Sequence, residues 1–367
     1  MARPMGPVRL RRTNYLTLFI GAVLCLFILY FLLQSGSDSP YSSSQNPNAN
    51  RPPIRKPTSK SSLIGERPPV RRYNLNNVTI TTDPIGNREA VLILTPMARF
   101  YQEYWDNLLK LNYPHELISL GFILPKNKEG NAATTALQAQ ITKTQKGPLK
   151  DRFRSIVIER QDFDPPLVSQ DESERHKMEN QKARRASMSR ARNSLLFTTL
   201  GVDTSWVLWL DSDIVETPPT LIQDLASHDK ALIVPNCYQR YIDSETGKLA
   251  ERPYDFNSWQ DSPTAQEIAN KMGPDDILLE GYSEMATYRA LMAYMAEKED
   301  EKELEVNLDG VGGTALLVKA DVHRDGAMFP PFPFYNLIET EGFAKMAKRL
   351  GWQAVGLPNY KVYHYNE

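Results

Sequence analysis

The most constraining feature of the chain is an apolar run that ends in two carboxylates, Trp206-Val-Leu-Trp-Leu-Asp-Ser-Asp213. Because nearly every position from Trp206 to Leu210 is apolar or aromatic, the run predicts a strand that is buried on both faces. Asp211 and Asp213 then stand at the carboxyl end of this strand, where carboxylate oxygens can hold a hard divalent cation such as Mn²⁺ or Mg²⁺. The alternative is a loop pair ahead of a helix that Thr217-Pro-Pro219 would start.

Strands and helices alternate around this run. The sequence predicts strands over residues 89–96, 118–124, 153–159, 206–210 and 231–235, and helices over residues 100–111, 132–145 and 173–200. Such alternation predicts an α/β fold with a mostly parallel central sheet flanked by helices. Ligands bind outside the carboxyl ends of the strands in these sheets. Thr95, Pro96 and Arg99 also lie at a strand end, so they join the Asp pair as candidate ligand contacts.

An uncharged segment of 19 residues, Tyr15 to Leu33, lies near the amino terminus. At ~1.5 Å per residue, a helix of this length crosses a hydrocarbon core of roughly 30 Å. The nearby arginines all precede the segment, so the positive-inside rule places residues 1–14 in the cytosol and the rest across the membrane. We therefore predict an uncleaved transmembrane signal-anchor. A cleaved signal peptide is the alternative, although its apolar region is usually shorter, about 7–15 residues.

Residues 34–84 are rich in Ser, Asn and Pro and lack apolar periodicity, which predicts an extended stem ahead of a luminal domain, residues 85–367. The only Asn-x-Ser/Thr sequon is at Asn77, which the predicted topology exposes to glycosylation. Residues 1–72 carry a net charge of +9 and the remainder −10. An acidic domain argues against nucleic acid as a partner. With Cys237 as its single cysteine, the domain has to be stabilised by its core, not by an internal disulfide.

The second half of the domain carries further polar motifs. Residues 262–305 are predicted to be an irregular helical region whose methionine-rich stripe packs in the core or faces a partner subunit. The glycine-rich turn Asp309-Gly-Val-Gly-Gly-Thr314 fits neither a P-loop nor a dinucleotide fingerprint. It either lets the backbone approach a ligand or forms a strand bulge. Glu339 and Glu341 open a helix, where they could act in catalysis or only balance the helix dipole. His364 is a candidate further metal ligand.

In order and spacing, these motifs resemble the fungal mannan polymerase subunits, glycosyltransferase family 62. The resemblance covers residues 85–367 and rests on the Asp-x-Asp strand, Ser189-Arg-Ala-Arg-Asn-Ser-Leu-Leu196, the glycine-rich turn, Glu339-Thr-Glu-Gly-Phe343 and the Val-Tyr-His-Tyr ending. It implies a GT-A-like nucleotide-sugar transferase fold in a single-pass type II protein of the Golgi membrane. The short luminal part resembles most the subunit shared by both mannan polymerase complexes.

The resemblance also implies an activity and partners. The activity is α-1,6-mannosyl transfer with retention, from GDP-mannose to the outer-chain mannan backbone of N-glycans, with Mn²⁺ (or Mg²⁺) as cofactor. The partners are related mannan polymerase subunits in a hetero-oligomer. Two alternatives stay open, namely a structural subunit that positions other transferases and a Golgi glycosyltransferase that uses another nucleotide sugar. The intact Asp pair, the glycine-rich turn and the late histidine favour an enzyme, since a scaffold needs none of them.

Roles for the candidate residues follow from the resemblance. Asp213 is the first choice for a metal ligand, Asp211 could bind the metal, the ribose or the sugar, and His364 would complete the metal shell. Candidates for donor or phosphate contacts carry guanidinium groups, which pair bidentately with phosphate but can equally lie on a solvated helix face. They are Arg99, Arg185, Arg190 and Arg192. The carboxylates that could stabilise charge at the sugar or position the acceptor hydroxyl are Asp309, Glu339 and Glu341.

Overall fold

The computed structural model describes residues 72–161, 177–282, 284–296 and 303–366, which belong to one unit beginning at Arg72. The predicted membrane segment and residues 34–71 of the predicted stem lie outside the described residues. Within the described ranges, no helix has both the length and the apolar character to cross a bilayer. The last part of the predicted stem, residues 72–84, belongs to this unit, and the hydroxyl of Tyr113 donates a hydrogen bond to the carbonyl of Pro84 (3.1 Å).

The helices and strands follow the predicted order closely up to residue 235. The strands are β1 (Ala90–Pro96), β2 (Ile118–Pro125), β3 (Ser155–Gln161), β4 (Thr204–Leu210), β5 (Ile214–Glu216), β6 (Leu232–Ile242), β7 (Leu249–Pro253), β8 (Trp259–Gln260), β9 (Ala290–Leu291), β10 (Val306–Leu308), β11 (Ala315–Lys319) and β12 (Ala354–His364). The α-helices are α2 (Gln102–Leu109), α3 (Lys128–Lys146), α5 (Met178–Thr199), α6 (Leu221–Ser227), α7 (Pro263–Lys271), α8 (Ala320–Arg324) and α9 (Glu339–Arg349). The short 3-10 helices are η1 (Leu75–Asn77), η2 (His115–Leu117), η3 (Leu149–Asp151) and η4 (Met292–Tyr294).

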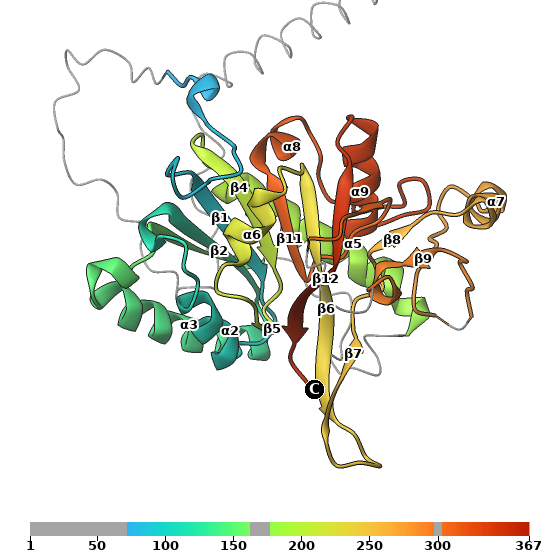
Figure 1. Cartoon of the computed structure of the whole chain (residues 1–367), viewed down its shortest axis with the longest axis horizontal. Coiled ribbons are helices and arrows are strands. Elements are labelled where there is room, and N and C mark those ends of the chain that lie inside the picture. Colours follow the sequence, from blue (N-terminus) through green and yellow to red (C-terminus); the bar gives the residue numbers. More distant parts are fainter. Residues whose placement is uncertain (1–71, 162–176, 283, 297–302, 367) are drawn as a thin grey trace, which may run out of the picture. The chain divides into compact units, whose positions relative to one another are not determined.

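A ten-stranded sheet in the order β10-β12-β6-β11-β4-β1-β2-β3 runs through the unit, with β5 paired to β12 and β7 paired to β6 (Figure 1). Strands β3, β2, β1 and β4 pair in parallel. Strand β11 is antiparallel to both β4 and β6, and β12 is parallel to β6. Therefore β6 and β12 point the same way as β1 to β4, while β10 and β11 point the opposite way. The predicted α/β fold is confirmed, but the sheet is mixed and not mostly parallel, because five of its nine strand pairings are antiparallel.

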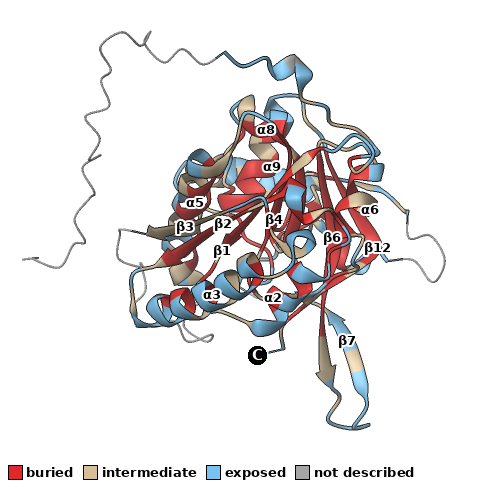
Figure 2. Cartoon of the chain, turned by 90° about the vertical axis from the view of Figure 1, so that its left-hand side faces the viewer, coloured by how far each residue is buried: buried red, intermediate tan, exposed pale blue. Residues whose placement is uncertain are grey.

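Helices cover both faces of the sheet, as the alternating pattern predicts (Figure 2). One core cluster packs beneath α2, α3 and α6, and a second packs beneath α5, α8 and α9. Strand β4 contributes to both clusters, because Trp206, Leu208 and Leu210 point to the first and Val207 and Trp209 to the second. All seven residues of β4 are buried. The prediction of a strand buried on both faces is therefore confirmed.

The described residues between 262 and 305 contain little helix beyond α7, so the prediction of an irregular helical region is wrong for them. In the described part of this region, the regular elements are α7, β9 and the single turn η4. Gly273-Pro274 follows α7, and proline cannot continue a helix because it lacks the amide donor. Tyr288 has a positive φ of 59° and is 66% exposed, whereas Met292 is buried. The methionine-rich stripe therefore does not lie on one helix.

Strand β6 continues past the predicted residues 231–235 to Ile242. Its polar side chains find partners on neighbouring segments. The amide of Asn236 donates to the carbonyl of Pro358 (3.0 Å), and the guanidinium of Arg252 in β7 donates to Oε1 of Gln239 (2.7 Å). Because these tertiary contacts pair Nδ2 of Asn236 and Oε1 of Gln239, the strand extends without an apolar pattern that the sequence could display.

A buried histidine connects α8 to β4. His323 accepts a hydrogen bond at Nε2 from the indole of Trp209 (3.2 Å), and its Nδ1 lies 2.9 Å from the carbonyl oxygen of Ala327. Nδ1 therefore carries the proton, and the ring satisfies both partners in its neutral form. Burial lowers the pKa of His323 from 6.5 to about 4, although the carbonyl of Ala327 acts in the opposite direction.

We expect His323 to make the fold sensitive to acid. The unfolded chain takes up this proton near pH 6.5 and the folded chain only near pH 4, so the stabilising contribution is present above pH 6.5 and is lost as the pH falls to 4. The shift corresponds to about 3 kcal/mol of unfolding free energy. Denaturant unfolding at neutral pH and near pH 4 measures it. His323→Gln keeps one donor and one acceptor and should flatten the dependence, so an equally steep variant would contradict this origin.

Candidate functional site

The two carboxylates of the Asp-x-Asp motif lie just beyond the carboxyl end of β4. The chain turns there, since the amide of Asp211 donates to the carbonyl of Thr314 (3.0 Å) and the amide of Ile214 donates to the carbonyl of Asp211 (3.1 Å). Strand β5 then pairs with the end of β12, which sets His364 beside Ile214. Nε2 of His364 comes to 3.1 Å from Oδ2 of Asp213. Two predicted site residues that are distant in the sequence thus meet.

The contacts of His364 leave its Nε2 able to bind a cation. Nδ1 lies 2.6 Å from the carbonyl oxygen of Tyr365, so this nitrogen carries the proton, and the ring stacks on Tyr254 with centroids 3.7 Å apart. In a neutral imidazole Nε2 is then an acceptor, yet it faces the carboxylate of Asp213, which is also an acceptor. A proton or a metal ion has to lie between the two. Imidazole nitrogen and carboxylate oxygen suit Mn²⁺, and a bond from Nδ1 to a carbonyl is the usual orienting contact of a metal-bound histidine.

This pair would supply part of a metal shell. Across the described residues, no group of three or more His, Cys, Asp or Glu side chains could hold a metal ion by itself. Asp213 and His364 would therefore leave the remaining coordination positions to water and to groups of a ligand. Hard cations such as Mg²⁺ are often bound in this way, through one or two carboxylates together with substrate phosphates. The residues present fit a metal that binds together with phosphate groups of a ligand.

Asp211 is held by a different partner from Asp213. Arg192 in α5 donates from Nη2 to Oδ1 of Asp211 (2.8 Å) and from Nε to Oε1 of Glu339 (3.3 Å). Its guanidinium also lies over the rings of Trp209 and Phe329, 5.5 Å from each centroid. Burial raises the pKa of Asp211 to about 6, with Asp213 and Glu339 acting in the same direction and Arg192 opposing them. Arg192 thus stabilises the ionised form of a carboxylate that its surroundings would tend to protonate.

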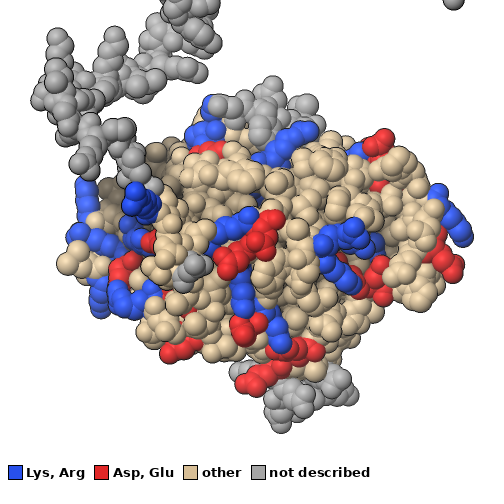
Figure 3. Space-filling view, turned by 90° about the horizontal axis from the view of Figure 1, so that it is seen from above, with Lys and Arg blue, Asp and Glu red and all other residues tan. Residues whose placement is uncertain are grey.

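These residues line a pocket of about 510 Å³. Carboxylates outnumber guanidinium groups in its lining. The carboxylates are Asp211, Asp213, Asp255, Glu280, Glu284 and Glu339. The guanidinium groups are Arg184, Arg185 and Arg192. On the face of the molecule that Figure 3 shows, acidic and basic side chains are instead interspersed. The pocket is therefore a locally acidic site, and an anionic ligand would require a cation in it.

The sequence of this chain carries a recognisable family pattern. A family model described as Anp1 matches residues 69–333. The chain belongs to the Anp1 family. It is 58% identical over 296 residues to the mannan polymerase complex subunit mnn9 of Schizosaccharomyces pombe, a match that covers 80% of this chain and 86% of that protein.

A second relative carries the same kind of name. The chain is 54% identical over 298 residues to the mannan polymerase complex subunit MNN9 of Candida albicans, which covers 81% of this chain and 80% of that protein. The resemblance to fungal mannan polymerase subunits is therefore confirmed for the family. There is also a distant likeness to the solved mannosyltransferase PcManGT from Pyrobaculum calidifontis in complex with GDP-Man and Mn²⁺, with 12% identity and a TM-score of 0.42 over 78% of this chain and 59% of that chain.

In this member of the Anp1 family, several predicted donor contacts do not line the pocket. Thr95 is buried, and its hydroxyl shares a hydrogen bond of 2.5 Å with the hydroxyl of Tyr104. Pro96 ends β1, and Arg99 reaches Glu129 at 3.9 Å in an exposed pair. Arg190 is exposed on α5. Of the four predicted arginines, the structure brings Arg185 and Arg192 to the pocket.

The three predicted catalytic carboxylates have three different environments. Glu339 lines the pocket and pairs with Arg192, and its backbone has a positive φ of 57°. Glu341 is fully buried outside the pocket lining, where it pairs with Arg185. Asp309 also lies outside that lining, accepts a hydrogen bond from the amide of Asp261 (2.8 Å) and pairs with Lys348. The sequence does not choose among the three, and the structure brings Glu339 to the pocket.

Several residues that line the pocket are not marked by any pattern in the sequence. Asp255 and Asn257 follow β7, and Glu280 and Tyr282 lie in the irregular segment after α7. Glu280 is buried and accepts hydrogen bonds from Arg289 (2.9 Å) and Thr287 (2.6 Å). These residues stand in stretches without helical or strand periodicity, so no local pattern marks them. A buried site with several polar residues outside regular elements depends on tertiary pairing.

Proposed function

We propose that this chain is a mannosyltransferase subunit of a mannan polymerase complex. It transfers mannose from GDP-mannose, with retention, to form α-1,6 linkages in the outer chain of N-glycans, and its domain is a GT-A-like fold. Asp213 and His364 would hold Mn²⁺ or Mg²⁺, with Asp211 beside them. The observation that carries the proposal is the contact between Asp213 and His364 at the edge of an acidic pocket.

The charges of the pocket support a metal-dependent donor. Its lining holds six carboxylates and three guanidinium groups, so a diphosphate entering alone would meet net repulsion. A divalent metal would neutralise part of that charge and act as a Lewis acid on the departing diphosphate. Asp213 and His364 would orient the ion, and Arg192 keeps Asp211 in place. A volume of about 510 Å³ lies within the usual range of ligand sites, roughly 300–1,000 Å³.

The names of the relatives support the partners of this proposal. The two proteins at 58% and 54% identity are called subunits of mannan polymerase complexes. We propose that this chain likewise assembles with related subunits into a hetero-oligomer. The same names favour the second candidate function, a structural subunit that positions other transferases. An intact Asp213–His364 pair favours the enzyme, because a scaffold does not require it.

Binding measurements on the full chain test the function. GDP, UDP, GDP-mannose and UDP-galactose are titrated with and without Mn²⁺, and mannose transfer to an α-linked mannose oligosaccharide is assayed. We expect binding of the guanosine nucleotides to depend on Mn²⁺ and transfer to follow it. Preference for the uridine nucleotides would indicate another donor. The absence of both nucleotide binding and transfer, in a chain that still assembles with its partners, would indicate the scaffold.

We also propose a Golgi protein with one membrane span and a luminal domain. This proposal rests on the uncharged segment Tyr15 to Leu33, which has nearby arginines only on its amino-terminal side. Asn77, exposed in η1, would then be open to glycosylation in the lumen. In sealed vesicles carrying the full chain, an added protease should leave the domain intact until detergent is present. Digestion without detergent would contradict this topology.

A further inference from the structure

The three glycines of the turn Asp309-Gly-Val-Gly-Gly-Thr314 each make room for a side chain. A β-carbon on Gly310 would overlap the indole ring of Trp259, one on Gly312 would overlap Oδ2 of Asp255, and one on Gly313 would lie 2.7 Å from Nη2 of Arg192. None of the three glycines has a positive φ. The turn therefore needs glycine for close packing of side chains and not for its backbone conformation.

Gly312 leaves space for the side chain of Asp255. One oxygen of this carboxylate, Oδ1, is fixed by Asn257. Oδ1 accepts hydrogen bonds from the backbone amide and from Nδ2 of Asn257, both at 2.9 Å. Oδ2 accepts one long bond from the hydroxyl of Thr314 (3.3 Å). Asp255 is buried, lines the pocket and has only neutral hydrogen-bond donors among the described residues. Oδ2 thus keeps accepting capacity on a residue that lines the pocket.

Other carboxylates of the pocket differ in this respect. Arg192 contacts Asp211 and Glu339, and Arg289 contacts Glu280. Asp213 contacts His364. A buried carboxylate without a cationic partner is costly unless other groups stabilise it. Asp255 retains its accepting capacity where a polar ligand would meet it, which is the arrangement expected of a binding group.

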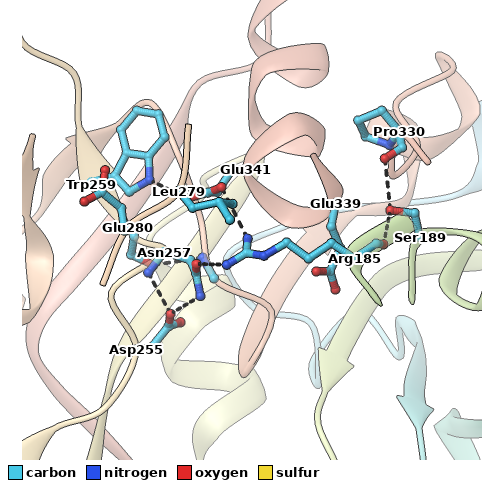
Figure 4. A network of polar contacts seen from close by, with 12 residues as sticks. Arg185, Ser189, Asp255, Asn257, Trp259, Leu279, Glu280, Pro330, Glu339 and Glu341 are labelled. Atoms are coloured by element: carbon cyan, nitrogen blue, oxygen red, sulfur yellow. Dashed lines mark hydrogen bonds and ion pairs between the residues drawn. The ribbon is translucent and has the colours of Figure 1, made fainter. Parts of the chain in front are cut away.

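A buried network fixes the direction of this carboxylate (Figure 4). Glu341 pairs with Nη1 of Arg185 (3.3 Å), and Nη2 of Arg185 donates to Oδ1 of Asn257 (3.0 Å). Because the amide oxygen of Asn257 is engaged by Arg185, its Nδ2 must point to Asp255. The contacts run from α9 through α5 to the segment after β7. They leave Asp255 one orientation, with Oδ2 against Gly312.

We propose that Asp255 binds a hydroxyl group of the substrate's sugar, accepting its hydrogen bond at Oδ2, and that Gly312 is glycine in order to admit this carboxylate. The assignment rests on the proposed function, since it places a hexose in the same pocket as the metal-bound diphosphate. The hydroxyl belongs either to the transferred mannose or to the acceptor sugar, which share this chemistry. Asn257 and Arg185 are positioning residues for Asp255.

Asp255→Asn in the full chain tests the assignment. The donors of Asn257 hold an oxygen at the Oδ1 position, so the new amide nitrogen must take the place of Oδ2 and turns an acceptor into a donor. A hydrogen bond to a charged group is lost, and kcat/KM for mannose transfer should fall ~10- to 100-fold. Mn²⁺-dependent GDP affinity should stay within about twofold, since the metal pair is untouched. Asp203→Asn, an exposed residue paired with Arg154 before β4, is the matched control and should transfer normally.

Hydrolysis of GDP-mannose without acceptor separates the two sources of the hydroxyl. If Asp255 binds the transferred mannose, hydrolysis and transfer fall together in Asp255→Asn. If it binds the acceptor, hydrolysis is unchanged and the KM for the acceptor oligosaccharide rises. Either result supports the assignment. Unchanged transfer in Asp255→Asn would overturn it while leaving the proposed function standing, whereas a wild-type chain with neither metal-dependent GDP binding nor transfer would overturn both.

Gly312→Ala provides an independent measurement. Its methyl group would displace Oδ2 of Asp255, so the loss of transfer should match that of Asp255→Asn while GDP binding is retained. In an Asp255→Ala background the displaced group is absent, and Gly312→Ala should add little. Thermal unfolding of each variant shows that it is folded. Losses that add in full would mean that Gly312 and Asp255 act separately, which contradicts the proposal.

Discussion

Replacing Asp213 by alanine is expected to abolish Mn²⁺-dependent GDP binding and mannose transfer with little change in the unfolding free energy. The side chain is partly exposed at a strand end, so it contributes little packing. It is also one of two protein groups that fit the metal. Loss of a residue that only orients a metal ligand typically costs ~10- to 100-fold in metal affinity, so loss of the ligand itself should cost more. Calorimetric titration with GDP, in the presence and absence of Mn²⁺, measures the effect.

The variant His364→Ala should act in the same direction. It removes the other group of the pair, and it also removes the stacking on Tyr254, so thermal unfolding has to be measured alongside. Association with partner subunits should be retained in both variants. Asp203→Ala is the control for a carboxylate outside the pocket. If the double variant Asp211→Ala with Asp213→Ala binds GDP with unchanged affinity in Mn²⁺, then Asp211 and Asp213 are structural and the proposed function fails.

The position of the Asp pair could be predicted because strand β4 is recognisable by itself. A strand buried on both faces has to be apolar throughout, and this requirement leaves a mark that needs no knowledge of its neighbours. The different partners of the two carboxylates could not be predicted in the same way. Arg192 reaches Asp211 from α5, and His364 reaches Asp213 only because β12 pairs with β5. Those contacts depend on the whole sheet.

The choice among the remaining carboxylates shows the limit of local patterns. Asp309 and Glu341 precede glycines in motifs typical of a site. In the structure, however, Asp309 forms an ion pair with Lys348, and Glu341 forms one with Arg185. Asp255 lies in an irregular segment with no such motif. Whether a carboxylate is available to a ligand depends on whether a cation pairs with it in the folded chain. The glycine-rich turn predicts either a ligand close to the backbone or a strand bulge, whereas in the structure Gly312 admits the side chain of Asp255.

Removing Glu341 is expected to destabilise the fold strongly. Glu341 is fully buried, pairs with Arg185 and accepts a hydrogen bond from the indole of Trp259 (3.0 Å). Arg185 is buried as well, so Glu341→Ala would leave a guanidinium without its counter-charge and an indole without its acceptor. Breaking a buried pair in this way costs about 3–5 kcal/mol. Denaturant unfolding of the full chain should show a loss of this size.

Two comparisons identify the cause of that loss. Glu116→Ala breaks the exposed pair with Arg88 and should change the unfolding free energy by no more than ~1 kcal/mol. Arg185→Met combined with Glu341→Gln removes both buried charges and keeps an acceptor for Trp259, so it should recover most of the stability. Mannose transfer should stay low in this double variant, because Asn257 loses Arg185 and no longer fixes Asp255. If the double variant is as unstable as Glu341→Ala, the network stabilises the fold through packing and not through its charges.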